Sequence, residues 1–167
     1  MLLKPHTPKN ISVELLSSLD EIDAKQWNAL ADGTPVLSHE FLSALEHSGS
    51  VGQGTGWSPF PLVVKQHNQL IGAMPMYLKS HSYGEYVFDW AWAEAYQRSG
   101  LNYYPKLLSA IPFSPITSAR LLAKDDYVKS LMIGAIEDAM RQHKLSSAHV
   151  LFPGDACAAQ FEAAGWL

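Results

Sequence analysis

The sequence contains a single cysteine, Cys157, among its 167 residues. One cysteine excludes an internal disulfide framework and a cysteine-rich zinc site, and it favours a reducing, cytoplasmic setting. No apolar run approaches the roughly 20 residues of a membrane helix. Residues 1–10 also lack the run of about 7–15 apolar residues that a signal peptide needs. We therefore expect a soluble protein with no transmembrane segment.

An excess of basic residues is also absent. The chain has 12 Lys and Arg against 16 Asp and Glu, for a net charge of −4. No general electrostatic attraction therefore draws it toward DNA, other nucleic acids or an anionic membrane. The seven histidines show no metal-ligand spacing, and no serine lies in a nucleophile elbow, so we expect neither a metal site nor a nucleophilic enzyme. The length and the 47% hydrophobic content predict one globular domain over residues 1–167.

Periodicity and capping residues predict strands alternating with helices. Strands are expected at 11–16, 60–66, 69–79, 85–90, 107–111 and 148–152, and helices at 23–30, 38–48, 91–99, 125–144 and 156–164. The runs on either side of His67-Asn68 form a predicted hairpin, in which Pro75 should mark a bulge or an unpaired edge. The order implies an α/β fold, with a mixed sheet covered by helices on both faces.

Half of the chain's Trp, Tyr and Phe residues lie between Tyr77 and Tyr104, with charged residues between them. Aromatic side chains combined with a few polar groups are typical of a ligand cleft. A buried sheet whose tyrosines need hydrogen-bond partners would give the same pattern, and both interpretations stay open here.

Within this region, His81 and Glu85 are four residues apart and can act as proton-transfer partners if the chain folds them together. A carboxylate among aromatic rings would have a raised pKa, which suits a general base near neutral pH. The alternative is an exposed turn at Gly84, with both side chains in water.

A second candidate segment runs from Pro112 to Leu122 and leads toward the helix predicted at 125–144. It supplies hydroxyl groups, backbone N–H groups and the cation of Arg120. A loop before a helix N-terminus is a common phosphate site. Asp125 and Asp126 at that helix start would, however, repel a phosphate placed directly there. The alternative is a plain connector with a surface arginine.

Three stretches carry a resemblance to a known family: 37–46 (LSHEFLSALE), 79–93 (KSHSYGEYVFDWAWA), and 103–108 (YYPKLL) with 112–115 (PFSP). They resemble the FemAB-like predicted N-acyltransferases, described as peptidoglycan biosynthesis or recognition proteins. The resemblance extends from about Ser38 to the C-terminus. It implies the GNAT acyltransferase fold, whose element order agrees with the one predicted above.

The resemblance also implies roles for individual residues. Glu85 or Asp89, together with His81, would accept the proton of an acceptor amine. An acyl-CoA donor such as acetyl-CoA would meet the loop through Pro115, Ile116, Thr117, Ser118 and Arg120. The substrate, a small molecule or a cell-wall precursor, would contact His39, Tyr83, Tyr86, Trp90, Tyr103 and Tyr104.

Two departures from the family pattern qualify this expectation. GNAT proteins that bind acyl-CoA usually have glycines in the phosphate loop, and the segment from Pro112 to Leu122 has none. The fold also normally continues with further strands, so the chain resembles an N-terminal half with an open sheet edge, through which we expect a homodimer. A non-catalytic half that recognises a peptidoglycan precursor is therefore the alternative to an acyltransferase. Transfer from aminoacyl-tRNA would need a basic surface that this chain lacks.

Overall fold

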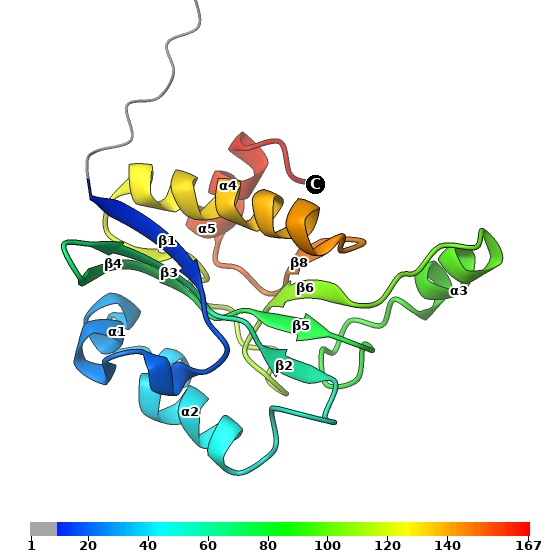
Figure 1. Ribbon diagram of the computed structural model, residues 1–167, viewed down its shortest axis with the longest axis horizontal. Coiled ribbons are helices and arrows are strands. Elements are labelled where there is room, and N and C mark those ends of the chain that lie inside the picture. Colours follow the sequence, from blue (N-terminus) through cyan, green and yellow to red (C-terminus); the bar gives the residue numbers. More distant parts are fainter. Residues whose placement is uncertain (1–9) are drawn as a thin grey trace, which may run out of the picture.

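The computed structural model describes residues 10–167, which form five α-helices and eight β-strands (Figure 1). The elements are β1 (Ile11–Leu15), α1 (Ala24–Ala31), α2 (His39–His47), β2 (Trp57–Pro59), β3 (Leu62–Gln66), β4 (Gln69–Met74), β5 (Tyr77–Lys79), α3 (Trp90–Arg98), β6 (Lys106–Ser109), β7 (Leu122–Ala123), α4 (Asp126–His143), β8 (Ala148–Val150) and α5 (Asp155–Ala163). Short 3-10 turns at Leu19–Glu21 and Pro35–Leu37 precede α1 and α2.

Side-chain caps fix the starts of the first two helices, as the sequence predicts. The Asp23 carboxylate accepts a hydrogen bond from the N–H of Gln26 (2.9 Å). The Ser38 hydroxyl accepts one from the N–H of Phe41 (3.2 Å). Each bond satisfies a backbone donor that the first helical turn leaves without a partner.

The strands form two four-stranded sheets, ordered β1-β3-β4-β7 and β2-β5-β6-β8. The predicted hairpin is confirmed, with positive φ at both His67 and Asn68 in its turn. Its two arms run on into the second sheet as β2 and β5. Proline interrupts each arm, at Pro61 and Pro75, and one hydrogen bond from Phe60 N to Met76 O (2.8 Å) connects the arms there. The single strand predicted at 69–79 is therefore two strands in two sheets, because proline cannot donate to a ladder.

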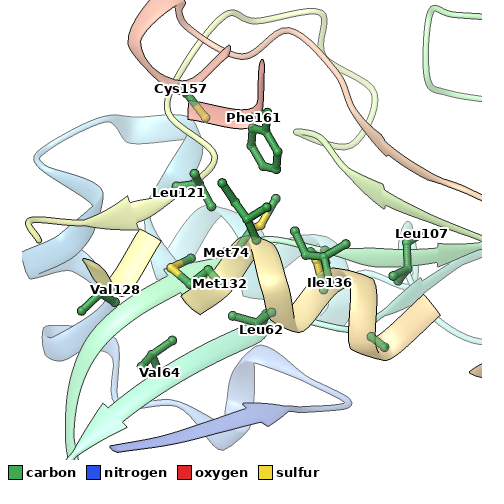
Figure 2. Packing of buried hydrophobic residues seen from close by; sticks show 13 residues of the cluster. Leu62, Val64, Met74, Leu107, Leu121, Val128, Met132, Ile136, Cys157 and Phe161 are labelled. Atoms are coloured by element: carbon green, nitrogen blue, oxygen red, sulfur yellow. The ribbon is translucent and has the colours of Figure 1, made fainter. Parts of the chain in front are cut away.

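The first sheet is covered by helices on both faces, as predicted. Val63 packs with α1 and α2, while its neighbours Leu62 and Val64 pack toward Met132 and Ile136 of α4 (Figure 2). This alternation follows the period of two along a strand. Burial of both faces explains why the three residues read as a continuous apolar run in the sequence.

Residues 80–105 connect β5 to β6, and α3 (Trp90–Arg98) within this segment projects away from both sheets (Figure 1). The strand predicted at 85–90 is wrong, because this stretch is a series of turns that leads into α3. Tyr86 has a φ of 62°, which interrupts an extended backbone. Glu85 and Asp89 in this stretch are buried.

The second sheet ends at β8, which runs parallel to β6. Leu107 N and Leu151 N bond across this pair, to Ser147 O and Ser109 O. The backbone groups of Ala148 and Val150 therefore point to the far side of β8. No strand within residues 10–167 pairs with that side, so the structure has the open edge that the sequence predicts.

Within residues 10–167, no helix has the length and apolar character to cross a membrane.

Candidate active site

Two buried lysines on neighbouring strands form the base of the candidate site. Lys79 ends β5 and Lys106 begins β6, and the antiparallel register places them directly opposite each other. Their side chains are almost completely buried. The Lys79 ammonium group lies 3.8 Å from the centre of the Trp57 ring, a favourable cation–π contact.

Two carboxylates from the segment after β5 neutralise these lysines. Lys106 Nζ lies 2.8 Å from Glu85 Oε2 and also contacts Asp89 Oδ2. Lys79 Nζ lies 3.9 Å from Glu85 Oε1. We call these four residues the ion cluster. Its formal charges balance, and such balance is what makes buried charges tolerable.

Two consecutive tyrosines close one side of the ion cluster. Tyr103 donates a hydrogen bond to Asp89 Oδ2 (2.7 Å), and Tyr104 donates one to Asp89 Oδ1 (2.8 Å). His149 on β8 lies behind Tyr103, with 3.4 Å between its Nε2 atom and the phenol oxygen. Every oxygen of Asp89 is thus bonded, and Asp89 is held in one orientation.

The two carboxylates have pKa values displaced in opposite directions. Burial raises the pKa of Glu85, and the bond from Lys106 only partly offsets this. Burial also acts to raise the pKa of Asp89, but the bonds from Lys106 and both tyrosines prevail and lower it to about 2. Desolvation lowers the pKa of Lys79 to about 8. Two carboxyl groups with separated pKa values are typical of acid–base sites.

Glu85 has one oxygen available for chemistry. Its Oε2 atom binds Lys106, whereas Oε1 is buried and forms no hydrogen bond within residues 10–167. A buried acceptor without a donor is costly and commonly marks a functional group. Glu85 as a whole is 3% exposed, so a substrate reaches it only if the covering segment moves.

The segment that covers the ion cluster turns its aromatic rings toward solvent. Between Glu85 and Asp89 the alternation of a strand is absent, because Tyr86, Val87 and Phe88 are all exposed. The carboxylates point inward to the lysines, while Tyr86, Phe88 and Trp90 are exposed. The buried lysines thus determine which side of this segment faces the protein.

A groove of about 500 Å³ runs along α3 beside the ion cluster. Its lining includes Trp90, Tyr103 and Tyr104, three of the residues predicted to bind substrate, together with Glu94 and Leu101. Tyr103 and Tyr104 therefore connect the groove to Asp89. The other predicted aromatic contacts, Tyr83 and Tyr86, are exposed on the segment that covers the ion cluster.

The two predicted histidines lie outside the ion cluster. The ring of His81 packs against Tyr83, 5.0 Å between centroids, and burial lowers the pKa of His81. His39 begins α2, where its Nε2 atom bonds Leu19 O (2.8 Å). His39 therefore stabilises the helical layer on the first sheet and is not brought to the groove.

Comparisons with known proteins identify the family and support the fold. The sequence profile of the FemAB-like family, described as peptidoglycan biosynthesis/recognition, matches residues 18–167. The chain belongs to the FemAB-like family. A solved structure with a similar fold is the ribosomal-protein-alanine N-acetyltransferase from Brucella melitensis biovar Abortus 2308. It is 12% identical, with a TM-score of 0.51 over 93% of this chain and 89% of that one. A search of curated proteins finds no match.

The solved structure supports the GNAT-like fold of this FemAB-like chain, and that fold is consistent with an acyl-CoA donor.

The predicted contact of Arg120 with the donor's phosphates needs correction. Arg120 is completely buried, and all three guanidinium nitrogens donate to nearby oxygens, including Leu151 O and Ile116 O. Arg120 also bonds Ser118 Oγ and so holds the loop closed against β8. Desolvation lowers its pKa to about 10.

The start of α4 does not fit a diphosphate either. Asp125 caps the helix by accepting from Tyr127 N (2.7 Å), and Asp126 is exposed beside it. Two carboxylates at this position repel an anion. Of the predicted donor loop, Pro115, Ile116 and Thr117 remain exposed and able to meet a ligand. No group of three potential metal ligands occurs among the described residues of this FemAB-like chain.

Sequence reasoning missed Lys79, Lys106 and His149. Lys106 lies in a strand whose four residues are all buried, and Lys79 follows Tyr77 on the same inward face of β5. A lysine at an inward strand position needs a partner, because an unpaired buried charge is prohibitively costly. That rule applied to β5 and β6 would have indicated the ion cluster.

Proposed function

We propose that this FemAB-like chain transfers an acyl or aminoacyl group to an amine, with the ion cluster and the groove along α3 forming the acceptor side. Family membership and the GNAT-like fold support acyl transfer as the reaction class. The family description suggests an acceptor from peptidoglycan biosynthesis. Cys157 is free and buried, which suits a reducing, cytoplasmic setting for such a precursor.

The observation that carries the proposal is the buried Oε1 atom of Glu85, which accepts no hydrogen bond within residues 10–167. In acyl transfer, the amine nitrogen attacks the carbonyl carbon of the donor. A C–N bond forms, the bond to the leaving group breaks with its electron pair, and the nitrogen gives up a proton. Glu85 Oε1 accepts that proton. The raised pKa of Glu85 suits this role, because a base is most effective when its pKa is near the working pH.

The groove supplies the contacts that position the acceptor. The aromatic faces of Trp90, Tyr103 and Tyr104 bind apolar groups and attract an amine in its cationic form. Access from the groove to Glu85 requires residues 83–86 to move.

The alternative is a recognition domain without catalysis. The burial of Glu85 favours it, since a closed ion cluster would serve only to hold the groove and α3 in place. The loss of Arg120 as a phosphate ligand favours it too. In that case the groove binds a precursor that is never modified.

Measurement of acyl transfer from acetyl-CoA to a panel of amines, including muropeptides, separates the two functions. We expect Glu85→Gln, which keeps the bond to Lys106, to lower transfer by about 10²–10⁴-fold. The matched control is Glu162→Gln, which removes an exposed carboxylate on α5, outside the lining of the groove. Full activity of Glu85→Gln would remove Glu85 from the mechanism. Muropeptide binding without turnover by the unaltered chain would support the recognition domain.

A further inference from the structure

The segment at residues 83–101, which we call the aromatic arm, exposes an unusual amount of apolar surface. The helix within it, α3, has no buried residue. Six large apolar side chains of the aromatic arm are 57–67% exposed, and we call these six residues the aromatic patch: Tyr83, Tyr86, Phe88, Trp90, Trp92 and Leu101. A nine-residue helix with no core behind it is marginal in water, so packing elsewhere has to stabilise it.

The aromatic patch is preformed. Trp90 packs against Phe88 (5.0 Å between centroids) and against Tyr83 (6.4 Å), so these three rings form a continuous surface at the base of α3. Asp89 in the ion cluster holds the base of the arm, and Tyr96 packs on Tyr103 (5.2 Å). A surface ordered in this way loses little entropy when a partner binds.

The size of the aromatic patch matches that of a protein interface. Five rings at this exposure offer on the order of 600 Å² of surface. The largest apolar patch on a typical monomer is about 300–600 Å², and a stable interface covers about 800 Å² on each partner. The patch therefore supplies most of one side of an interface. Its Trp and Tyr content is also that of interface hot spots.

We propose that the aromatic patch is the contact surface between two copies of this chain. Charge selects the partner. Glu85 and Asp89 are buried, so the only exposed charges of the aromatic arm are Glu94 and Arg98, which pair with each other (3.8 Å). The net charge of the exposed arm is therefore zero. Two copies can bring their arms together without electrostatic repulsion, although each whole chain has a net charge of −4. The arm has no cluster of Lys or Arg that would bind an anionic membrane instead.

This inference rests on exposure, packing and charge, and it does not depend on the proposed acyl transfer. It has one consequence for the candidate site. Trp90 belongs both to the aromatic patch and to the lining of the groove. A second copy seated on the patch therefore borders the groove and narrows its opening.

Sedimentation velocity on the whole chain, at about 1–100 µM, tests the interface. We expect a dimer, and we expect Trp92→Glu to weaken dimerisation at least tenfold while the circular dichroism spectrum stays unchanged. Val13→Glu, which places the same charge at an exposed apolar position on β1, should leave the dimer intact. A monomer at every concentration, or a dimer insensitive to Trp92→Glu, would overturn the proposal.

A further variant separates the aromatic patch from the open edge of β8. Ala148→Pro removes an outward backbone N–H at the first residue of that strand, where proline is best tolerated. We expect this variant to remain dimeric. If Ala148→Pro dissociates the dimer and Trp92→Glu does not, the contact is the sheet edge. If the chain is monomeric but sediments with phosphatidylcholine vesicles, the patch is a membrane contact. Either result contradicts the proposal.

Discussion

Lys79 and Lys106 lie directly opposite each other on β5 and β6, with both ammonium groups buried. Like charges at directly opposed positions destabilise a sheet. Here Glu85 lies between them, 2.8 Å from Lys106 and 3.9 Å from Lys79, and Asp89 supplies the second negative charge. The pair therefore exists only because residues 80–89 fold back over it, so the ion cluster links the sheet to the aromatic arm.

Removal of one lysine should destabilise the protein strongly. Lys106→Met leaves Glu85 and Asp89 without their closest cation, and breaking a buried ion pair costs about 3–5 kcal/mol. Lys65→Met is the matched control, because Lys65 pairs with Glu14 at the surface (2.7 Å), where such pairs are worth about 0–1 kcal/mol. Urea unfolding followed by circular dichroism measures both. Equal losses in the two variants would show that the ion cluster adds nothing to stability.

The pKa of Asp89 predicts how stability depends on pH. The native value is lowered from 3.8 to about 2, so the unfolded chain binds more protons than the native one between these values. Stability is therefore fully present above about pH 4 and is lost as the pH falls toward 2, by about 2 kcal/mol. Asp89→Asn should flatten the stability curve in this range.

Glu85 contributes to the pH dependence with the opposite sign. Its native pKa is raised above 4.5, so the native chain binds more protons than the unfolded one above that pH, and the contribution of Glu85 to stability increases as the pH falls toward 4.5. The comparison must therefore be the difference between the unaltered chain and Asp89→Asn, measured by urea unfolding from pH 2 to 6. A difference that stays constant across this range would contradict the lowered pKa of Asp89.

Local patterns predict much of the fold because their causes are local. The spacing of Val128, Met132, Ile136 and Ala139 predicts α4, and all four are buried on one face of it. Asp23 and Ser38 predict helix starts because each needs only a backbone donor a few residues ahead. In the same way, the turn at His67-Asn68 requires only its two flanking apolar runs.

The candidate site was only half predictable, because its members come from distant parts of the chain. Glu85 and Asp89 could be selected from their aromatic surroundings. Their partner Lys106 lies 21 residues from Glu85 along the chain, and no local pattern connects them. The sequence also predicted a strand over 85–90, and a buried sheet was one of two interpretations of the aromatic residues there. Two buried lysines need carboxylate partners, and this requirement outweighs the burial of aromatic rings. The segment therefore directs its carboxylates inward and its aromatic rings toward solvent.

A pair of glycine substitutions tests the packing of His81 beside the candidate site. Gly56 and Gly54 have nearly the same φ, +79° and +81°, so alanine brings similar backbone strain at both. A Cβ atom at Gly56 would lie 2.0 Å from His81 Nε2, whereas a Cβ at Gly54 meets nothing within 4 Å. Gly56→Ala must therefore displace the ring of His81 and disturb its contact with Tyr83.

We expect Gly56→Ala to cost about 0.5–1.5 kcal/mol more than Gly54→Ala, because the half-buried ring of His81 has to leave its rotamer. Thermal unfolding of the two variants gives the difference, and an NMR titration of His81 reports the ring directly. If both variants unfold at the same temperature and the His81 resonances do not change, His81 is not packed against Gly56.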